Sequence, residues 1–210
     1  VQSQRDQSRR ARKRSATPTV SLVGYTNAGK STLFNAITNA EVYAADQLFA
    51  TLDPTLRRMS VPGMGEVVLV DTVGFIRHLP HKLVEAFKET QEADLLLHVI
   101  DCADDDRQLN MEQVEIVLDE IDALDRPTLQ VFNKIDKVPG ASHKIDRDEK
   151  GLPWRVWVSA MDRKGLELIH QAIGELLSTT LFEQVIEIEP KDGQLRSLLY
   201  AHNAVLTESV

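Results

Sequence analysis

Eight consecutive residues have the types and the spacing of a phosphate-binding loop. Gly24 and Gly29 lie five positions apart and are followed directly by Lys30 and Ser31. In this pattern the backbone N–H groups of a glycine-rich loop point at a chain of phosphates. The lysine then lies at the β- and γ-phosphates, and the serine hydroxyl binds Mg²⁺. A buried strand precedes the loop and a helix follows it, so the helix dipole adds to the anion site. The predicted nucleotide contacts here are Gly24, Tyr25, Thr26, Asn27, Ala28, Gly29, Lys30, Ser31 and Thr32.

A second group of polar residues predicts which base the site accepts. Asn133, Lys134 and Asp136 follow a buried strand, at the edge where ligands bind in open α/β sheets. A carboxylate can accept from both N1–H and the exocyclic amine of guanine, whereas adenine has no donor at N1. The mismatch costs about 1–3 kcal/mol per unpaired group. Asn133 can bridge the base N7 and nearby loop backbone, and the Lys134 stem can lie on the base face. The predicted base contacts are Asn133, Lys134, Ile135 and Asp136, followed after the next strand by Ser159, Ala160 and Met161, whose N–H groups can reach the guanine O6.

Two further segments supply the groups that a Mg²⁺–phosphate site needs. Asp71 is placed to hold Mg²⁺ through a water, and the Gly74 N–H can contact the γ-phosphate and swing away after hydrolysis. One threonine of the loop over 49–55 should complete the magnesium site, and spacing alone leaves Thr51 and Thr55 open. The predicted contacts in these segments are Phe49, Ala50, Thr51, Leu52, Asp53, Asp71, Thr72, Val73 and Gly74.

The elements around these motifs alternate between strand and helix patterns. The alternation predicts an α/β fold with a mostly parallel doubly wound sheet, one antiparallel hairpin strand and helices on both faces. Residues 137–153 are polar and are expected to form a long surface loop with at most a short helix. Strands are predicted over 19–23, 56–61, 66–71, 94–101, 128–133 and 154–159, and helices over 31–37, 83–92, 106–124 and 164–177.

Three domains are expected along the chain. Residues 1–17 form a basic linker or the end of an upstream helix, and 18–180 form the nucleotide-binding domain. Residues 181–210, with a strand over 185–189 and a helix over 194–201, form the start of a truncated C-terminal domain. The chain opens without Met, which suggests a piece of a longer protein.

Composition and charge narrow the class of protein further. No apolar run approaches the roughly 20 residues that span a bilayer, and the single cysteine, Cys102, suits a reducing cytosol. A cytoplasmic monomer is expected. Residues 1–14 carry six bases and one acid, a net charge of +5, while the other 18 bases and 31 acids give −13. This basic arm could contact nucleic acid or carry the charges of a solvated linker, and both interpretations stay open. His98, Trp154 and Trp157 are expected in packing roles.

The motifs, in this order and spacing, resemble those of the translation-factor-like GTPases. Three longer strings resemble the HflX family of the Obg–HflX group: Gly-Tyr-Thr-Asn-Ala-Gly-Lys-Ser-Thr, Phe-Ala-Thr-Leu-Asp-Pro-Thr and Asp-Thr-Val-Gly-Phe-Ile-Arg-His-Leu-Pro. The resemblance covers about residues 9–180 and implies a P-loop GTPase domain that hydrolyses GTP to GDP. It also implies that Ser31, Thr51 and Asp71 serve Mg²⁺, that the partner is the ribosome, mainly its large subunit and RNA, and that a further domain precedes the GTPase domain.

Two positions bear on the rate of hydrolysis. Phe75 stands where many small GTPases place a glutamine that orients the attacking water, so a slow free enzyme is expected. Asn27 resembles the asparagine of GTPases that bind K⁺ beside the phosphates, although it could equally brace the loop. The residues expected to act in hydrolysis are Asn27, Lys30, Thr51 and Gly74.

Three functions compete at this point. The first is a GTP-driven switch that splits or rescues stalled ribosomes under stress. The second is a ribosome-assembly or RNA-maturation factor that uses the same domain as a GTP-gated binding module. The third, an ATPase such as a small kinase, is opposed by Asp136.

Overall fold

The computed structural model of this protein describes residues 17–38, 55–72, 74–75, 87–178, 192–201 and 205. The chain divides into two compact units, one of Thr17–Thr180 and a second of Val1–Ala16 with Leu181–Val210. The predicted basic arm and the predicted strand over 185–189 lie outside the described residues. The division into three domains stays a prediction.

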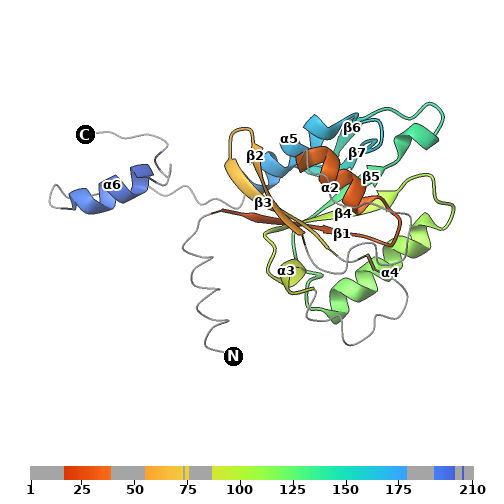
Figure 1. The fold of residues 1–210 in the computed structure, drawn as a ribbon, viewed down its shortest axis with the longest axis horizontal. Coiled ribbons are helices and arrows are strands. Elements are labelled where there is room, and N and C mark those ends of the chain that lie inside the picture. The colour runs from red at the N-terminus through yellow and green to blue at the C-terminus, as the bar shows by residue number, and fades with distance from the viewer. Residues whose placement is uncertain are drawn as a thin grey trace. The chain divides into compact units, whose positions relative to one another are not determined.

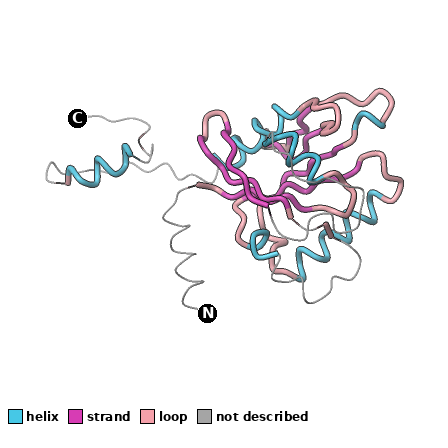
Figure 2. Tube along the Cα trace, in the orientation of Figure 1, coloured by secondary structure: helices cyan, strands magenta, loops and turns pink. Residues whose placement is uncertain are grey.

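A seven-stranded sheet forms the centre of the first unit, in the order β2-β3-β1-β4-β5-β7-β6. The pairs β1–β3, β1–β4, β4–β5 and β5–β7 are parallel, while β2 pairs antiparallel with β3 through a hairpin. The predicted fold class is therefore confirmed, as Figure 1 and Figure 2 show. The strands are β1 Thr19–Val23, β2 Thr55–Val61, β3 Gly65–Asp71, β4 Leu95–Asp101, β5 Thr128–Asn133, β6 Lys144–Arg147 and β7 Pro153–Trp157.

Strand β6 corrects the prediction of a plain loop over 137–153. It pairs antiparallel with β7 at the edge of the sheet and adds a second antiparallel pair. Its sequence, Lys-Ile-Asp-Arg, holds one apolar residue, so no alternating pattern is visible. The hydrogen-bonding edge of β7 supplies the partner that makes this polar segment a strand, which is a tertiary effect that propensity does not report.

The helices confirm the predicted types and shift some boundaries. They are α2 Lys30–Thr38, α3 Lys88–Gln91, α4 Arg107–Glu120, the 3₁₀ turn η2 Ile135–Lys137, α5 Leu166–Ser178 and α6 Gly193–Ala201, the last in the second unit. Helix α4 ends four residues before the predicted Leu124. Asp122 adopts a left-handed φ of 55°, and the N–H groups of Asp122 and Ala123 bond to Asp119 O and Leu118 O. This Schellman-type end satisfies the last carbonyls and stops the helix. Predicted helical residues 83–86 lie outside the described residues.

Two apolar layers hold the helices against opposite faces of the sheet. Helices α2 and α5 pack on one face around Leu33, Phe34 and Ile173, while α3 and α4 lie against the other face, around Val117 and Leu118 (Figure 1). Strand β4 lies between the layers, and its residues from Leu95 to Ile100 are all buried. A parallel sheet covered on both faces requires such a continuous apolar strand. The carboxyl ends of β1, β4, β5 and β7 therefore meet at one fixed edge.

Candidate nucleotide-binding site

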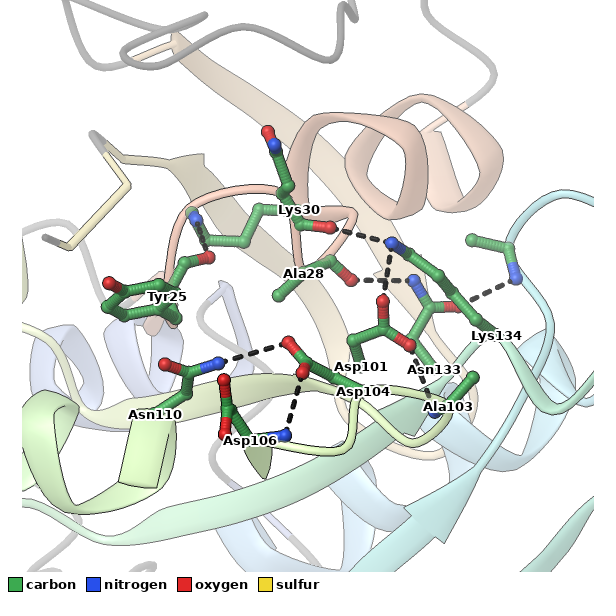
Figure 3. Close-up of polar contacts among 12 residues, drawn as sticks. Tyr25, Ala28, Lys30, Asp101, Ala103, Asp104, Asp106, Asn110, Asn133 and Lys134 are labelled. Atoms are coloured by element: carbon green, nitrogen blue, oxygen red, sulfur yellow. Dashed lines mark hydrogen bonds and ion pairs between the residues drawn. The ribbon is translucent and has the colours of Figure 1, made fainter. Parts of the chain in front are cut away.

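Those predicted motifs that fall within the described residues converge at this edge, where the strand order changes direction. The chain moves from β1 outward to β3 on one side, then returns to β4 on the other, which creates the crevice in which α/β sheets bind ligands. The phosphate loop follows β1, Asp101 ends β4, Asn133 ends β5, and Ser159 follows β7. Figure 3 shows the Asn133 side chain facing the backbone of Ala28 in the phosphate loop, with Asp101 and Lys134 beside it.

The backbone of the phosphate loop explains why positions 24 and 29 are glycines. Gly24 has φ +148°, and a Cβ there would lie 2.3 Å from Val99 O of β4. Gly29 has φ +94°, and its Cβ would lie 2.4 Å from the Asn133 side-chain nitrogen. Both distances are below any tolerable contact, so the loop reaches β4 and β5 only because these side chains are absent. Asn27, at φ 60°, occupies the left-handed region that asparagine tolerates.

Lys30 begins α2 and turns its ammonium back under the loop. Its Nζ donates to Gly24 O at 2.9 Å and to Tyr25 O at 3.0 Å, and the residue is buried. Burial lowers the pKa of the Lys30 ammonium to about 8, while the nearby Asp71 carboxylate opposes that shift. A buried cation at the start of a helix is the charge that a polyphosphate anion would compensate.

Phe75 ties the next segment to the phosphate loop through its backbone. Thr26 N donates to Phe75 O at 2.9 Å, and Phe75 N donates to Gly24 O at 3.1 Å. The Phe75 ring is fully buried and meets the Phe87 ring edge-on, at a centroid distance of 5.1 Å. Phe75 therefore packs in the core, as expected for a residue that orients no water.

Gly74 lies directly against the phosphate loop. A Cβ at this position would be 3.2 Å from Lys30 Nζ and 3.2 Å from Thr26 Cα. The lysine tip could move aside, but the backbone of Thr26 could not. The lack of a side chain at Gly74 therefore keeps its backbone close to the place where phosphates would lie.

Asn133 joins three loops with one side-chain amide. Its Nδ2 donates to Ala28 O in the phosphate loop at 3.1 Å, and its Oδ1 accepts from Ala160 N at 3.0 Å. The residue is 1% exposed. The loop-bridging half of its predicted role is thus present in the structure, while its contact with the base stays a prediction.

Lys134 connects the segment after β5 to the phosphate loop. Its Nζ donates to Asn27 O and to Asp101 Oδ2, both at 2.7 Å. Asp136 is exposed, and its Oδ1 accepts from Ser159 Oγ at 2.5 Å. The Ser159 hydroxyl was not expected from the sequence, because it lies on a different loop.

The three residues predicted to contact guanine O6, Ser159 to Met161, differ in what their backbones could offer to a base. Ser159 N donates to Lys164 O, and Ala160 N donates to Asn133 Oδ1, each at 3.0 Å. Two of the three N–H groups predicted to face guanine O6 thus already have acceptors within the protein. Met161 is 76% exposed.

The donor set fits a hard divalent cation. Ser31, at the start of α2, offers a hydroxyl, and Asp71, at the end of β3, offers a fully buried carboxylate beside Lys30. Oxygen donors of this kind suit Mg²⁺, which takes one or two protein ligands together with phosphates. Thr72 faces elsewhere, because its hydroxyl donates to Leu22 O at 2.5 Å. The remaining predicted contacts lie outside the described residues: Phe49, Ala50, Thr51, Leu52, Asp53 and Val73.

Asp101 is the functional candidate that the sequence analysis did not select. The sequence did show an acidic residue at the end of a buried strand, and this strand, β4, lies between β1 and β5, whose ends were selected. Its contact with Lys134 could not be read from the chain, because 33 residues separate the two.

The fold and the site together define a P-loop GTPase domain. Residues 19–134 match the model of a protein family described as 50S ribosome-binding GTPase. The chain therefore belongs to this family of ribosome-binding GTPases, in its HflX branch.

The chain is also similar to curated relatives and to proteins of known structure. The GTPase HflX of Escherichia coli strain K12 is 57% identical over 212 residues, which cover 99% of this chain and 50% of the relative. The chain thus spans about half the length of this relative. A GTP-binding protein from Sulfolobus solfataricus, solved with GDP, is 29% identical with a TM-score of 0.59, over 78% of this chain and 53% of that one.

A third similar protein is Era, solved in complex with MgGDPNP and nucleotides 1506–1542 of 16S ribosomal RNA. It is 26% identical with a TM-score of 0.61, over 84% of this chain and 60% of that one. Within the described residues, no helix is both long enough and apolar enough to cross a membrane.

Proposed function

We propose that this protein binds GTP, hydrolyses it to GDP and acts as a molecular switch on the large ribosomal subunit. The observation that carries the proposal is the network at the sheet edge. One amide, Asn133, holds the phosphate loop, and the neighbouring Lys134 binds the carbonyl of Asn27 in the same loop. These contacts support the proposal because they would hold the guanine-binding residues and the phosphate loop at a constant separation.

Each residue has a role in this proposal. The Lys30 ammonium leaves the loop carbonyls and binds the β- and γ-phosphates, and Gly74 N–H binds the γ-phosphate. Ser31, Asp71 and Thr51 serve Mg²⁺, which when bound neutralises charge that develops during phosphoryl transfer. Asn27 either binds K⁺ beside the phosphates or braces the loop. Because Phe75 orients no water, turnover is slow until a partner contributes.

The guanine assignment is tested at Asp136. An Asp136→Asn variant presents an amide donor, which suits the extra oxygen of xanthine and conflicts with the guanine amine. We expect weaker GTP binding and tighter binding of xanthosine triphosphate. Asp162→Asn is the matched control, because that exposed acid pairs with Lys164 and should leave the preference unchanged. Unchanged GTP affinity in the Asp136 variant would show that this carboxylate does not read the base.

The ribosomal role is supported by the family description and is tested by turnover. GTP hydrolysis by the full-length protein should rise on addition of 50S or 70S particles. We favour splitting or rescue of stalled ribosomes under stress, which requires action on mature 70S particles. Equal turnover with and without ribosomes would remove the ribosome as the activating partner.

One observation keeps a second function in view. Era, a protein of this fold with 26% identity, was solved bound to ribosomal RNA and MgGDPNP together. An assembly or RNA-maturation factor would act on precursor particles instead of mature ones. Binding assays on both kinds of particle, in GTP and in GDP, separate the two functions. Either function places the protein in the cytoplasm, where we propose that it works as a monomer.

A further inference from the structure

The carboxylate of Asp101 lies between two donors at the carboxyl end of β4. Its Oδ2 accepts from Lys134 Nζ at 2.7 Å, and its Oδ1 accepts from Ala103 N at 3.0 Å. The Lys134 and Asp101 side chains are only 21% and 20% exposed. This ion pair is therefore better shielded from water than the surface pairs that contribute little to stability.

The same ammonium continues to the phosphate loop. Lys134 Nζ also donates to Asn27 O at 2.7 Å, so one chain of contacts runs from β4 through Asp101 and Lys134 to Asn27 (Figure 3). Lys134 and Asn27 both have left-handed backbones, at φ 65° and 60°. Asparagine tolerates this conformation, but lysine adopts it rarely, so the Lys134 backbone depends on support from its surroundings.

We propose that Asp101 is a positioning residue of the nucleotide site. It fixes the Lys134 ammonium where that group supports the phosphate loop at Asn27. The proposal rests on the function proposed above, since it concerns how the same site is held together. Asp101 itself touches neither base nor phosphate in this mechanism.

The chemistry of the contact requires a carboxylate. Two N–H donors, from Lys134 and Ala103, converge on its two oxygens, and each oxygen accepts one bond. An asparagine amide has one acceptor oxygen and one donor nitrogen, so it can satisfy either donor and must face the other with N–H. A lysine side chain is flexible, and it stays in one conformation only where its partners are fixed.

The test is nucleotide release from an Asp101→Asn variant of the full-length protein, followed with fluorescent GDP. We expect release about tenfold faster than wild type, which corresponds to about 1.4 kcal/mol. The preference for guanine over xanthine should stay unchanged, because Asp136 is intact. A residue with a merely structural role would change unfolding without changing release.

A double-mutant cycle with Lys134→Ala isolates the proposed route. If Asp101 acts through Lys134, Asp101→Asn should have almost no further effect on release in the Lys134→Ala background. Additive effects would overturn the proposal. Should the Asn variant fail to fold, the cycle is repeated with Asp101→Glu, whose longer side chain displaces the carboxylate and should also speed release severalfold. Wild-type release in that variant would equally overturn it.

Asp104→Asn is the matched control. Asp104 lies in the loop that directly follows Asp101, but its carboxylate accepts from Asp106 N at 2.9 Å and from Asn110 Nδ2 at 3.0 Å. The Asp104→Asn variant should release nucleotide at the wild-type rate. A tenfold faster release would mean that loss of any carboxylate near the end of β4 has this effect. A wild-type protein that binds no guanine nucleotide would refute the proposed function itself. Wild-type binding with unaltered release in Asp101→Asn would refute this inference alone.

Discussion

Asn133→Ala tests whether one buried amide holds the nucleotide site together before any nucleotide binds. The substitution removes the partners of Ala28 O and Ala160 N, which lie on two different loops. Ala28 and Ala160 are each 3% exposed, so water reaches these groups poorly. The variant is therefore expected to destabilise the nucleotide-free protein as well as to weaken binding.

The magnitude follows from the two groups left without partners. A buried donor or acceptor that loses its hydrogen bond costs about 1–3 kcal/mol. Two such groups give roughly 2–6 kcal/mol, with the lower value applying if a water enters the space left by the amide. For a domain of this size, each kcal/mol lowers the melting temperature by about 2–4 °C. A decrease of roughly 4–24 °C in the melting temperature is thus expected.

The assay is thermal and urea unfolding of the nucleotide-free protein, with wild type and Asn110→Ala measured in parallel. Asn110 makes a single side-chain bond to Asp104 in a more accessible place, so its loss should cost less than about 1 kcal/mol. If Asn133→Ala unfolds like wild type while nucleotide binding is lost, the amide acts on the base alone and the bracing argument is wrong.

Three further outcomes are expected. Burial, and secondarily the Lys30 charge, lowers the pKa of His98 to about 4. The unfolded state, with a histidine pKa near 6.5, then takes up a proton first, so stability falls by about 2 kcal/mol between pH 7 and pH 5. The stability of His98→Gln, measured by urea unfolding, should fall less between pH 7 and pH 5 than that of the wild type. An equal fall in the two proteins would contradict this expectation. Gly74→Ala should lower the rate of GTP hydrolysis at least about tenfold, while the affinity for GDP should change less than about tenfold. The reason is that a Cβ would press on Thr26 Cα, beside the proposed γ-phosphate position. Normal turnover would show that this glycine does not contact the γ-phosphate. Hydrolysis should be faster in K⁺ than in Na⁺ at equal ionic strength, with the difference removed by Asn27→Ala, whereas equal rates would leave Asn27 as a loop brace.

The sequence by itself predicted the residues of the candidate site and determined most of the fold. Glycine, lysine and serine at fixed spacing predict a phosphate loop because only those residue types permit its backbone and charges. The alternation of apolar strands with amphipathic helices predicts a doubly wound sheet, since each pattern has one way to bury its apolar face. Every predicted strand that falls in the described residues of the first unit is present, within two residues at each end.

Only the tertiary structure decided which of these residues touch one another. Asn133 and Ala28 are 105 positions apart, and Lys134 and Asn27 are 107 apart. The contact between Asp101 and Lys134 depends in the same way on the placement of β4 beside β5, and strand β6 depends on the placement of β7. Local pattern reports what a segment prefers, whereas hydrogen bonds between strand ends depend on which strands are neighbours in the sheet. That order is set by packing over the whole domain, and no short stretch of sequence carries it.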